Sequence, residues 1–383
     1  MERLPALIAP KGPIVAAMSG GVDSSVAAAL LLEQGFEVIG VTLRMQACDE
    51  TGGDDDCCGA DSLAQARAAA DHLGIVHKVL DCREPFEKSV LLRSWQEYRQ
   101  GRTPNPCVMC NRDIKFGVLL DYAKTLGAQK IATGHYARLG GVKEGCGFII
   151  RGADLRKDQS YFLFAVDSGT LSRVFFPLGR YLKEEVRSLA RRLGLANADR
   201  VESQDACFAT KRTGFAEALR QRFAEGAIPG PILDETGRKV GDHEGIHLFT
   251  IGQRRGIGVT LGVPVWVKSI DPKNCSLTLT TAKEKLAARA LMASGVVWQA
   301  LVPRSVPLRC SVQVRYNQAP VPAIVELLEP GRVLVNFERF VTAVCPGQAA
   351  VFYSGPRLLG GGWIDRSFSG PVKISEVAGE IIS

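Results

Sequence analysis

The chain has 383 residues, a formal net charge of +7, 46% hydrophobic residues, 23% charged residues and eleven cysteines. This composition excludes an intrinsically disordered chain, and the length predicts two or three domains, each with its own core. No run approaches the roughly 18 to 20 apolar residues of a membrane span, and residues 1–13 lack the pattern of an export signal. We therefore expect a cytoplasmic protein that does not associate with membranes.

The number of cysteines and the net charge bear on which kinds of protein and partner are expected. An odd number of cysteines without an export signal disfavours a disulfide scaffold and favours reduced thiols that act as metal ligands, nucleophiles or core residues. The modest positive charge permits a polyanionic partner such as nucleic acid but does not require one.

The first half of the chain alternates strand-like and helix-like segments. In chain order we expect strand 14–18, helix 24–34, strand 36–43, helix 62–73, strand 75–80, helix 114–126 and strand 130–133. Gly35, Gly74 and Gly127 end the three helices. This alternation predicts a Rossmann-like α/β domain whose parallel sheet is covered on both faces and binds ligands at the carboxyl ends of its strands.

The second half has a different texture. Beyond Arg200, short segments broken by glycine and proline predict a small separate domain. From about Ser294, short alternating segments at 308–314, 321–328, 333–337 and 349–353 predict a C-terminal antiparallel β-barrel.

The strongest local signal lies between the first strand and the first helix, where the sequence is Ser19-Gly20-Gly21-Val22-Asp23-Ser24-Ser25. The glycines allow a tight turn with exposed N–H groups, the serines add hydroxyls, and the helix directs its positive end to the same place. A polyphosphate site is predicted, and an ordinary helix-capping turn is the alternative. The lysine of the Walker A motif is missing, and the turn instead resembles the PP-loop of ATP pyrophosphatases, which adenylate a carbonyl oxygen and release pyrophosphate.

A second signal is the CxxC of Cys107 and Cys110, which follows the stiff segment Thr103-Pro104-Asn105-Pro106. The sequence around the cysteines contains four cationic residues and one acidic residue, Asp113. This excess of positive charge stabilises thiolates and attracts phosphates, and it comes from Arg99, Arg102, Arg112 and Lys115. The two cysteines could be a redox pair, metal ligands or packing residues. A structural zinc site requires four ligands, and the chain has no second CxxC.

A third signal is Cys207, within Glu-Ser-Gln-Asp-Ala-Cys-Phe at 202–208. A lone cysteine beside phenylalanine is more often a core residue than a nucleophile. The context changes this interpretation, because the order of all these motifs resembles the tRNA-specific 2-thiouridylases of the PP-loop ATP pyrophosphatase superfamily. The likeness continues through ATGHYAR at 132–138, RKDQSYFL at 156–163, TIGQRRGIG at 250–258, VRY at 314–316 and PGQ at 346–348, and so covers nearly the whole chain.

The resemblance implies an activity and its partners. ATP with Mg²⁺ would adenylate the C2 carbonyl oxygen of the wobble uridine of tRNA, and sulfur carried as a cysteine persulfide would replace that oxygen, with release of AMP and pyrophosphate. Cys207 would carry the persulfide, and Cys110 would attack its outer sulfur or close a disulfide with it. A sulfur-donor protein, such as a cysteine desulfurase or a sulfur carrier, would supply the sulfur.

The resemblance also implies domains and contacts. Residues 1–210 would form the PP-loop ATP-binding catalytic domain, 211–288 a small central tRNA-binding or linker domain, and 289–383 the β-barrel domain. ATP would contact Ala17, Met18, Ser19, Gly20, Gly21, Val22, Asp23, Ser24, Leu43 and Gly134. The tRNA would contact Asn105, Pro106, Cys107, His135, Lys157, Asp158, Gln159, Arg315, Tyr316 and Gln348. For each of them a packed or solvated side chain is the alternative.

Two features depart from the family pattern. Many members have an aspartate where this chain has Cys107, so Cys107, Cys110 and Cys207 would together offer three thiolates for a [4Fe-4S] cluster with one open iron, as the alternative to the persulfide. An acidic segment around Cys48, Cys57 and Cys58 is interpreted as a loop that orders on substrate binding, with metal binding or sulfur transfer as alternatives.

Two rival classes remain. A PP-loop amidotransferase or ligase that adenylates a small metabolite would explain the glycine-rich turn, but not the spaced cysteines or the β-rich C-terminal region. A non-catalytic RNA-binding protein with a structural metal would not need the phosphate turn.

Overall fold

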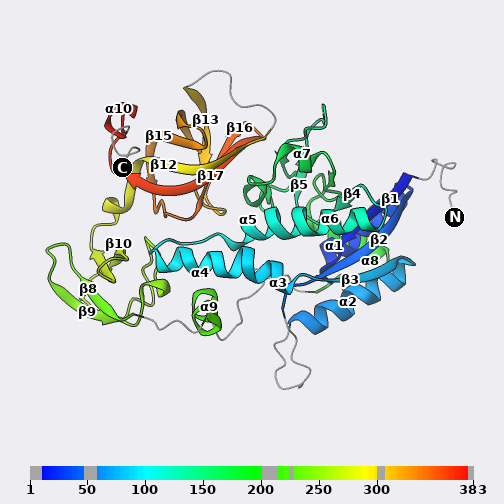
Figure 1. Cartoon of the computed structure of the whole chain (residues 1–383), viewed down its shortest axis with the longest axis horizontal. Helices are drawn as coiled ribbons and strands as arrows, with labels where there is room; N and C mark the ends of the chain where they lie inside the picture. The colour runs from blue at the N-terminus through cyan, green and yellow to red at the C-terminus, as the bar shows by residue number, and fades with distance from the viewer. Residues whose placement is uncertain are drawn as a thin grey trace. The chain divides into compact units, whose positions relative to one another are not determined.

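The computed structural model describes residues 11–46, 58–142, 144–200, 214–223, 228–299 and 307–377. These residues form two compact units, which are described separately. Unit 1 draws on Met1–Ser89 and Val108–Asp205, and unit 2 draws on Val90–Cys107 and Ala206–Ser383 (Figure 1).

Unit 1 is built on a parallel five-stranded sheet in the order β3–β2–β1–β4–β7. Its strands are β1 (Lys11–Ala17), β2 (Phe36–Arg44), β3 (Val76–Asp81), β4 (Lys130–Ala132) and β7 (Val174–Phe175). The predicted Rossmann-like α/β fold is confirmed. The edge strand β3 is covered less than expected, since Val76 is 61% exposed.

Helix α1 (Val22–Glu33) is the most enclosed helix of this unit's core. Ala28 and Leu31 pack with the strands and with α2 (Cys58–Leu73). Val26 and Leu30 pack with α8 (Lys183–Arg192) on another side. Nine of the twelve residues of α1 are buried, so its apolar residues are spread around the helix rather than confined to one face.

The helical segment expected at 114–126 is longer and less regular than predicted. It begins with α5 (Pro106–Cys110), continues through the π-helical stretch η2 (Asn111–Val118) and ends with α6 (Leu119–Thr125). Proline is well suited to the first turn of a helix, where its missing N–H leaves no bond unmade. A similar π-helical stretch, η1 (Glu87–Leu91), joins α3 (Arg83–Phe86) to α4 (Leu92–Arg99).

The remaining elements of unit 1 are short and carried little sequence signal. They are the hairpin of β5 (Ala137–Leu139) and β6 (Ile149–Arg151), the 3-10 turn η3 (Ser160–Leu163) and helix α7 (Ser168–Leu171).

Unit 2 contains a mixed four-stranded sheet in the order β10–β11–β8–β9. The strands are β8 (Gly230–Leu233), β9 (Lys239–His243), β10 (Trp266–Asp271) and β11 (Ser276–Thr280), and the short turns are η4 (Ile246–Leu248) and η5 (Lys283–Leu286). Helices α4 and α9 (Phe215–Phe223) pack on each other and on η4.

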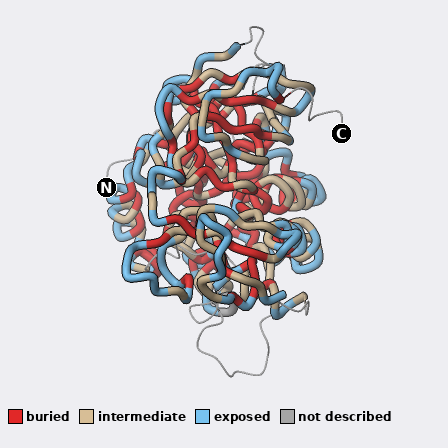
Figure 2. The backbone as a smooth tube through the Cα atoms, turned by 90° about the vertical axis from the view of Figure 1, so that its left-hand side faces the viewer, coloured by how far each residue is buried: buried red, intermediate tan, exposed pale blue. Residues whose placement is uncertain are grey.

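The C-terminal part of unit 2 is a closed antiparallel barrel, as predicted. Its strands are β12 (Ala287–Trp298), β13 (Leu308–Gln313), β14 (Val321–Glu329), β15 (Arg332–Thr342), β16 (Ala349–Ser354) and β17 (Arg357–Phe368), followed by α10 (Ile374–Val377). The barrel closes because β12 pairs with both β15 and β17. Buried residues lie mostly in the interior of each unit, and exposed residues lie on its outside (Figure 2).

Strand β17 was not predicted, and it contains the run Gly360-Gly361-Gly362. A Cβ at Gly360 would lie 2.4 Å from the Val297 carbonyl oxygen, and one at Gly362 would lie 2.9 Å from that of Ser294. Glycine is therefore required where β17 passes close to β12 and closes the barrel.

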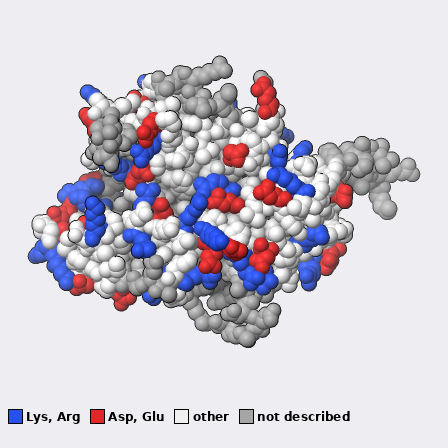
Figure 3. All heavy atoms as spheres, in the orientation of Figure 1, with Lys and Arg blue, Asp and Glu red and all other residues white. Residues whose placement is uncertain are grey.

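Among the described residues no helix is both long and apolar enough to cross a bilayer. On the face shown in Figure 3, lysine and arginine side chains are interspersed with aspartate and glutamate. This mixture matches the modest net charge of the whole chain.

Candidate functional site

The glycine-rich turn lies at the carboxyl end of β1 and opens α1, as predicted. Gly20 has φ +77°, and a Cβ there would lie 2.1 Å from the Ser62 carbonyl oxygen, so both backbone conformation and space require glycine. Gly21 is the N-cap of α1. Gly134 follows β4 and also approaches the turn, since a Cβ at Gly134 would lie 3.0 Å from the Ser24 backbone nitrogen. The fold therefore brings Gly134 to the turn.

The serines of the turn fix its shape. The Ser24 hydroxyl accepts a hydrogen bond from the Ser19 N–H at 3.1 Å and donates one to the Gly21 carbonyl at 2.9 Å. Thr42, next to Leu43 near the end of β2, donates to the Met18 carbonyl at 2.7 Å. The ends of β1 and β2 are thus tied together beside the first turn of α1, where N–H groups and the helix dipole favour an anion.

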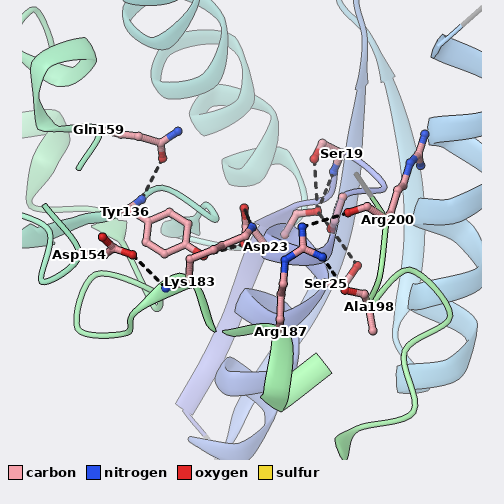
Figure 4. A network of polar contacts seen from close by, with 12 residues as sticks. Ser19, Asp23, Ser25, Tyr136, Asp154, Gln159, Lys183, Arg187, Ala198 and Arg200 are labelled. Carbon is pink, nitrogen blue, oxygen red and sulfur yellow. Dashed lines mark hydrogen bonds and ion pairs between the residues drawn. The ribbon is translucent and has the colours of Figure 1, made fainter. Parts of the chain in front are cut away.

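The Asp23 carboxylate is held by two residues from outside the turn (Figure 4). The Tyr136 hydroxyl donates to Asp23 Oδ1 at 2.8 Å. The Lys183 ammonium lies 2.7 Å from Oδ1 and 2.9 Å from Oδ2, and 5.7 Å from the centre of the Tyr136 ring. Lys183 is only 7% exposed, and its backbone N–H donates to buried Asp154 at 3.1 Å. The turn has no lysine of its own, and Lys183 brings a buried positive charge beside it.

The segment after α8 contacts the opposite side of the turn. Asn197 Nδ2 donates to the Gly20 carbonyl and to the Ser25 hydroxyl, both at 3.0 Å. Arg200 reaches the same carbonyl at 3.4 Å and pairs with Asp61 at 2.5 Å. Through these contacts, Asn197 and Arg200 anchor the segment after α8 on the glycine-rich turn. Cys207 itself lies outside the described residues.

The two cysteines of the CxxC lie one turn apart in α5. Cys107 is exposed, and Cys110 is buried with its sulfur 3.9 Å from that of Met45. Cys48 and Cys57 lie outside the described residues, as does the side chain of Cys58. Within the described residues, no group of three or more histidines, cysteines or carboxylates is arranged to hold a metal.

The positive surroundings of the CxxC are weaker than the sequence suggests. Arg112 pairs with Asp113 at 2.7 Å, and this contact raises the pKa of the guanidinium. Arg102 lies 2.7 Å from Glu97 and 3.7 Å from Asp365. Glu97 lies outside the motif, and Asp365 lies far from Arg102 in sequence. Both carboxylates offset the positive charge of Arg102.

Other cysteines behave as packing residues. Burial raises the pKa of Cys82 to about 11 and that of Cys310 to about 12, so both thiols stay protonated at neutral pH. Such thiols are poor nucleophiles.

The candidate tRNA contacts of unit 1 have internal partners. Asp158 is buried, pairs with Arg151 at 2.9 Å and accepts hydrogen bonds from Gly152 N–H at 2.9 Å and the Ser160 hydroxyl at 2.8 Å. Gln159 exchanges two hydrogen bonds with the Tyr136 backbone, each at 2.9 Å. These side chains order the 157–159 segment, and their contact with tRNA remains a prediction.

His135 is buried between two aromatic rings, those of Phe116 and Phe176, and its Nδ1 lies 2.7 Å from the Thr133 hydroxyl. Burial, and secondarily the charge of Lys115, hold the pKa of His135 well below its ordinary value. The imidazole is therefore neutral at physiological pH.

Among the candidate tRNA contacts of unit 2, Gln348 contacts the segment before α5. Gln348 Nε2 donates to the carbonyls of Thr103 at 3.1 Å and Pro104 at 2.9 Å, beside buried Asn105. Arg315 reaches the Cys345 sulfur at 3.1 Å and the Ile251 carbonyl at 3.4 Å. Gln313 donates to the carbonyls of Arg315 and Tyr316, which shapes that turn.

Comparison with known proteins finds matches along most of the chain. Three family models match: the tRNA methyl transferase HUP domain over residues 12–211, the tRNA methyl transferase PRC-barrel domain over 217–280 and the aminomethyltransferase beta-barrel domain over 288–364. The tRNA-specific 2-thiouridylase MnmA of Chloroflexus aurantiacus is 46% identical over 354 residues, which is 92% of this chain and 98% of that protein. Its counterpart in Pelotomaculum thermopropionicum is 45% identical over 359 residues, covering 93% and 98%.

The chain belongs to the tRNA-specific 2-thiouridylase family. One solved structure shows a lower similarity. A 4-thiouridine synthetase in complex with RNA and ATP aligns with a TM-score of 0.33 and 17% identity over 55% of this chain and 50% of that chain, too little to bear on the fold.

In this thiouridylase-family chain, sequence reasoning found the turn but missed the residues that surround it. Tyr136 stands inside the ATGHYAR motif, yet nothing in the motif indicates its bond to Asp23. Lys183 is 160 residues from Asp23 and is the first residue of the ordinary charged helix α8. Asn197 and Arg200 belong to no motif. A contact map, rather than a local pattern, would have been needed to find these four contacts.

Proposed function

We propose that the protein is a tRNA-uridine 2-sulfurtransferase that uses ATP to replace the C2 oxygen of the wobble uridine with sulfur. The observation that carries the proposal is the similarity of 92% of the chain to proteins named tRNA-specific 2-thiouridylase. The phosphate turn at the carboxyl end of β1 supports it independently, because its backbone conformation suits a polyphosphate.

The first step would be adenylation of the uridine. A carbonyl oxygen is a poor leaving group, and its attack on the α-phosphorus of ATP converts it into a phosphate ester while pyrophosphate departs. The N–H groups of the turn around Gly20 and Gly21 would bind the pyrophosphate portion, and Mg²⁺ would balance part of its charge. The uridine would have to leave the anticodon stack to reach this site.

The second step would transfer sulfur. The outer sulfur of a Cys207 persulfide attacks C2, a C–S bond forms, and the C–O bond breaks as AMP leaves. The Cys110 thiolate then attacks the Cys207 sulfur, so that a Cys110–Cys207 disulfide forms and the sulfur remains on the uridine. Two electrons from an external dithiol reduce the disulfide, and a sulfur-donor protein restores the persulfide.

An iron–sulfur cluster remains the alternative sulfur carrier, motivated by Cys107. Cys107 and Cys110 stand three residues apart in α5, a spacing that suits two thiolate ligands, and Cys207 would be the third. When bound, such a cluster would supply an open iron for a sulfide.

The test is a reconstitution. Purified protein receives ATP, Mg²⁺, a sulfur donor and bulk tRNA, and the digested RNA is analysed for 2-thiouridine while AMP is measured in solution. We expect both products, and we expect both sulfur transfer and 2-thiouridine to be lost in Cys207→Ser. Absence of the thionucleoside under oxic and anoxic conditions would refute the proposal, and AMP formation without tRNA would favour a small-metabolite ligase instead.

A further inference from the structure

Lys183 raises a question that the family motifs do not answer. Its ammonium is buried beside the phosphate turn, in contact with Asp23 and above the Tyr136 ring (Figure 4). The long side chain of a lysine loses much rotamer freedom when it is buried, and removal of its charge from water is costly. A buried ammonium such as that of Lys183 therefore suggests a functional role for its charge.

The charge on Asp23 gives a first use. The Asp23 carboxylate lies in the first turn of α1, where a polyphosphate would bind. Two neighbouring negative charges repel each other strongly in a partly buried site. Lys183 contacts both carboxylate oxygens, at 2.7 and 2.9 Å, and so neutralises Asp23.

The anchoring of Lys183 gives a second use. Lys183 is the first residue of α8, and its backbone N–H donates a hydrogen bond to Asp154, which is 3% exposed. Lys183 itself is buried in unit 1. The ammonium is therefore held in place before any ligand arrives, and a preorganised cation binds phosphate oxygens with little ordering cost.

We propose that Lys183 is a nucleotide-site residue, whose ammonium binds the β- and γ-phosphates of ATP and then the released pyrophosphate. Asp23 is its counter-ion in the absence of nucleotide. Lys183 thereby supplies, from 160 residues along the chain, the cation that the turn lacks. This inference rests on the proposed function, since it requires a nucleotide at the turn.

The experiment measures binding of ATP, inorganic pyrophosphate and adenosine to the full chain and to Lys183→Met. We expect the affinities for ATP and pyrophosphate to fall about 10- to 100-fold, as for loss of one charge-assisted hydrogen bond, and the affinity for adenosine to stay within about twofold. Lys183→Arg keeps the charge and should recover most of the loss. Lys88→Met removes a lysine from the exposed pair with Glu84 and serves as the matched control.

A second comparison separates phosphate binding from mere neutralisation of Asp23. In an Asp23→Asn background, Lys183→Met should still weaken pyrophosphate binding about 10-fold if the ammonium contacts phosphate. No further loss in that background would overturn the inference, as would an equal loss of adenosine affinity in the single variant. If the unaltered protein binds neither ATP nor pyrophosphate, the proposed function fails and the inference fails with it.

Discussion

The Tyr136 hydroxyl donates a hydrogen bond to Asp23 at 2.8 Å, while the backbone of the same tyrosine exchanges two hydrogen bonds with Gln159. One residue therefore joins the phosphate turn to the 157–159 segment that we expect to meet tRNA. A second connection runs from Asp154 through Lys183 to the same carboxylate. The position of Asp23 thus depends on a segment far from it in sequence.

Tyr136→Phe tests the first connection. The ring and both backbone bonds to Gln159 remain, and only the donor to Asp23 is lost, so we expect the KM for ATP to rise about 3- to 10-fold with the KM for tRNA unchanged. Steady-state thiolation at varied ATP and varied tRNA measures both. Tyr122→Phe, in α6, is the control for loss of a tyrosine hydroxyl. An equal rise in both constants would mean that the hydroxyl supports the unit as a whole.

Gln348 is expected to act through the segment before α5. Its amide donates to the carbonyls of Thr103 and Pro104, so Gln348→Ala removes two bonds that position the chain leading to Cys107. We expect kcat for thiolation to fall about 10-fold, as for two neutral hydrogen bonds, and the alkylation rate of Cys107 to change.

Gln100→Ala, an exposed glutamine just before the same segment, should leave both quantities unchanged. If Gln348→Ala alters only the KM for tRNA and leaves Cys107 alkylation unaffected, Gln348 contacts tRNA directly and does not position the segment.

Sequence reasoning succeeded where structure is local and failed where it is not. The turn around Gly20 and the alternation of β1, α1 and β2 depend on neighbouring residues and were predicted, although α1 begins at Val22 and not at Ser24 as expected. Strand β17 was missed because Gly360 is set by the approach of Val297, some sixty residues away in sequence. Lys183 was missed for the same reason, since only the fold brings it to Asp23. The division of the chain at Cys107, inside a helix, has no compositional signal either.

His135 predicts a pH dependence of stability. The pKa of His135 is well below its ordinary value in the folded state because of burial, whereas the unfolded chain takes up a proton near pH 6.5. Since the unfolded state then binds the extra proton, the free energy of unfolding falls as pH drops below about 6.5, by up to about 1.4 kcal/mol per pH unit.

His135→Asn keeps a polar partner for Thr133 without a titratable group. Urea unfolding at pH 7.5 and pH 5.5 should show a smaller loss of stability in this variant than in the unaltered protein. The contributions of other histidines, such as half-buried His77, whose pKa is also lowered by burial, remain in both proteins and cancel. Equal pH dependence in the two proteins would show that His135 takes up its proton without unfolding.

Cys107→Asp separates the two carriers of sulfur. The variant introduces the aspartate that many members of the family carry at this position. Cys107 is exposed and lies in α5. If Cys207 carries a persulfide, the carboxylate is compatible with the reaction, and we expect single-turnover thiolation within about threefold of the unaltered protein. If three thiolates hold a cluster, the variant loses a ligand, and iron, sulfide and thiolation should fall together after anaerobic purification. Cys110→Ser is the companion variant, because it should abolish turnover by either route. We expect Cys107→Asp to remain active, and a joint loss of iron and activity would contradict the persulfide route that we favour.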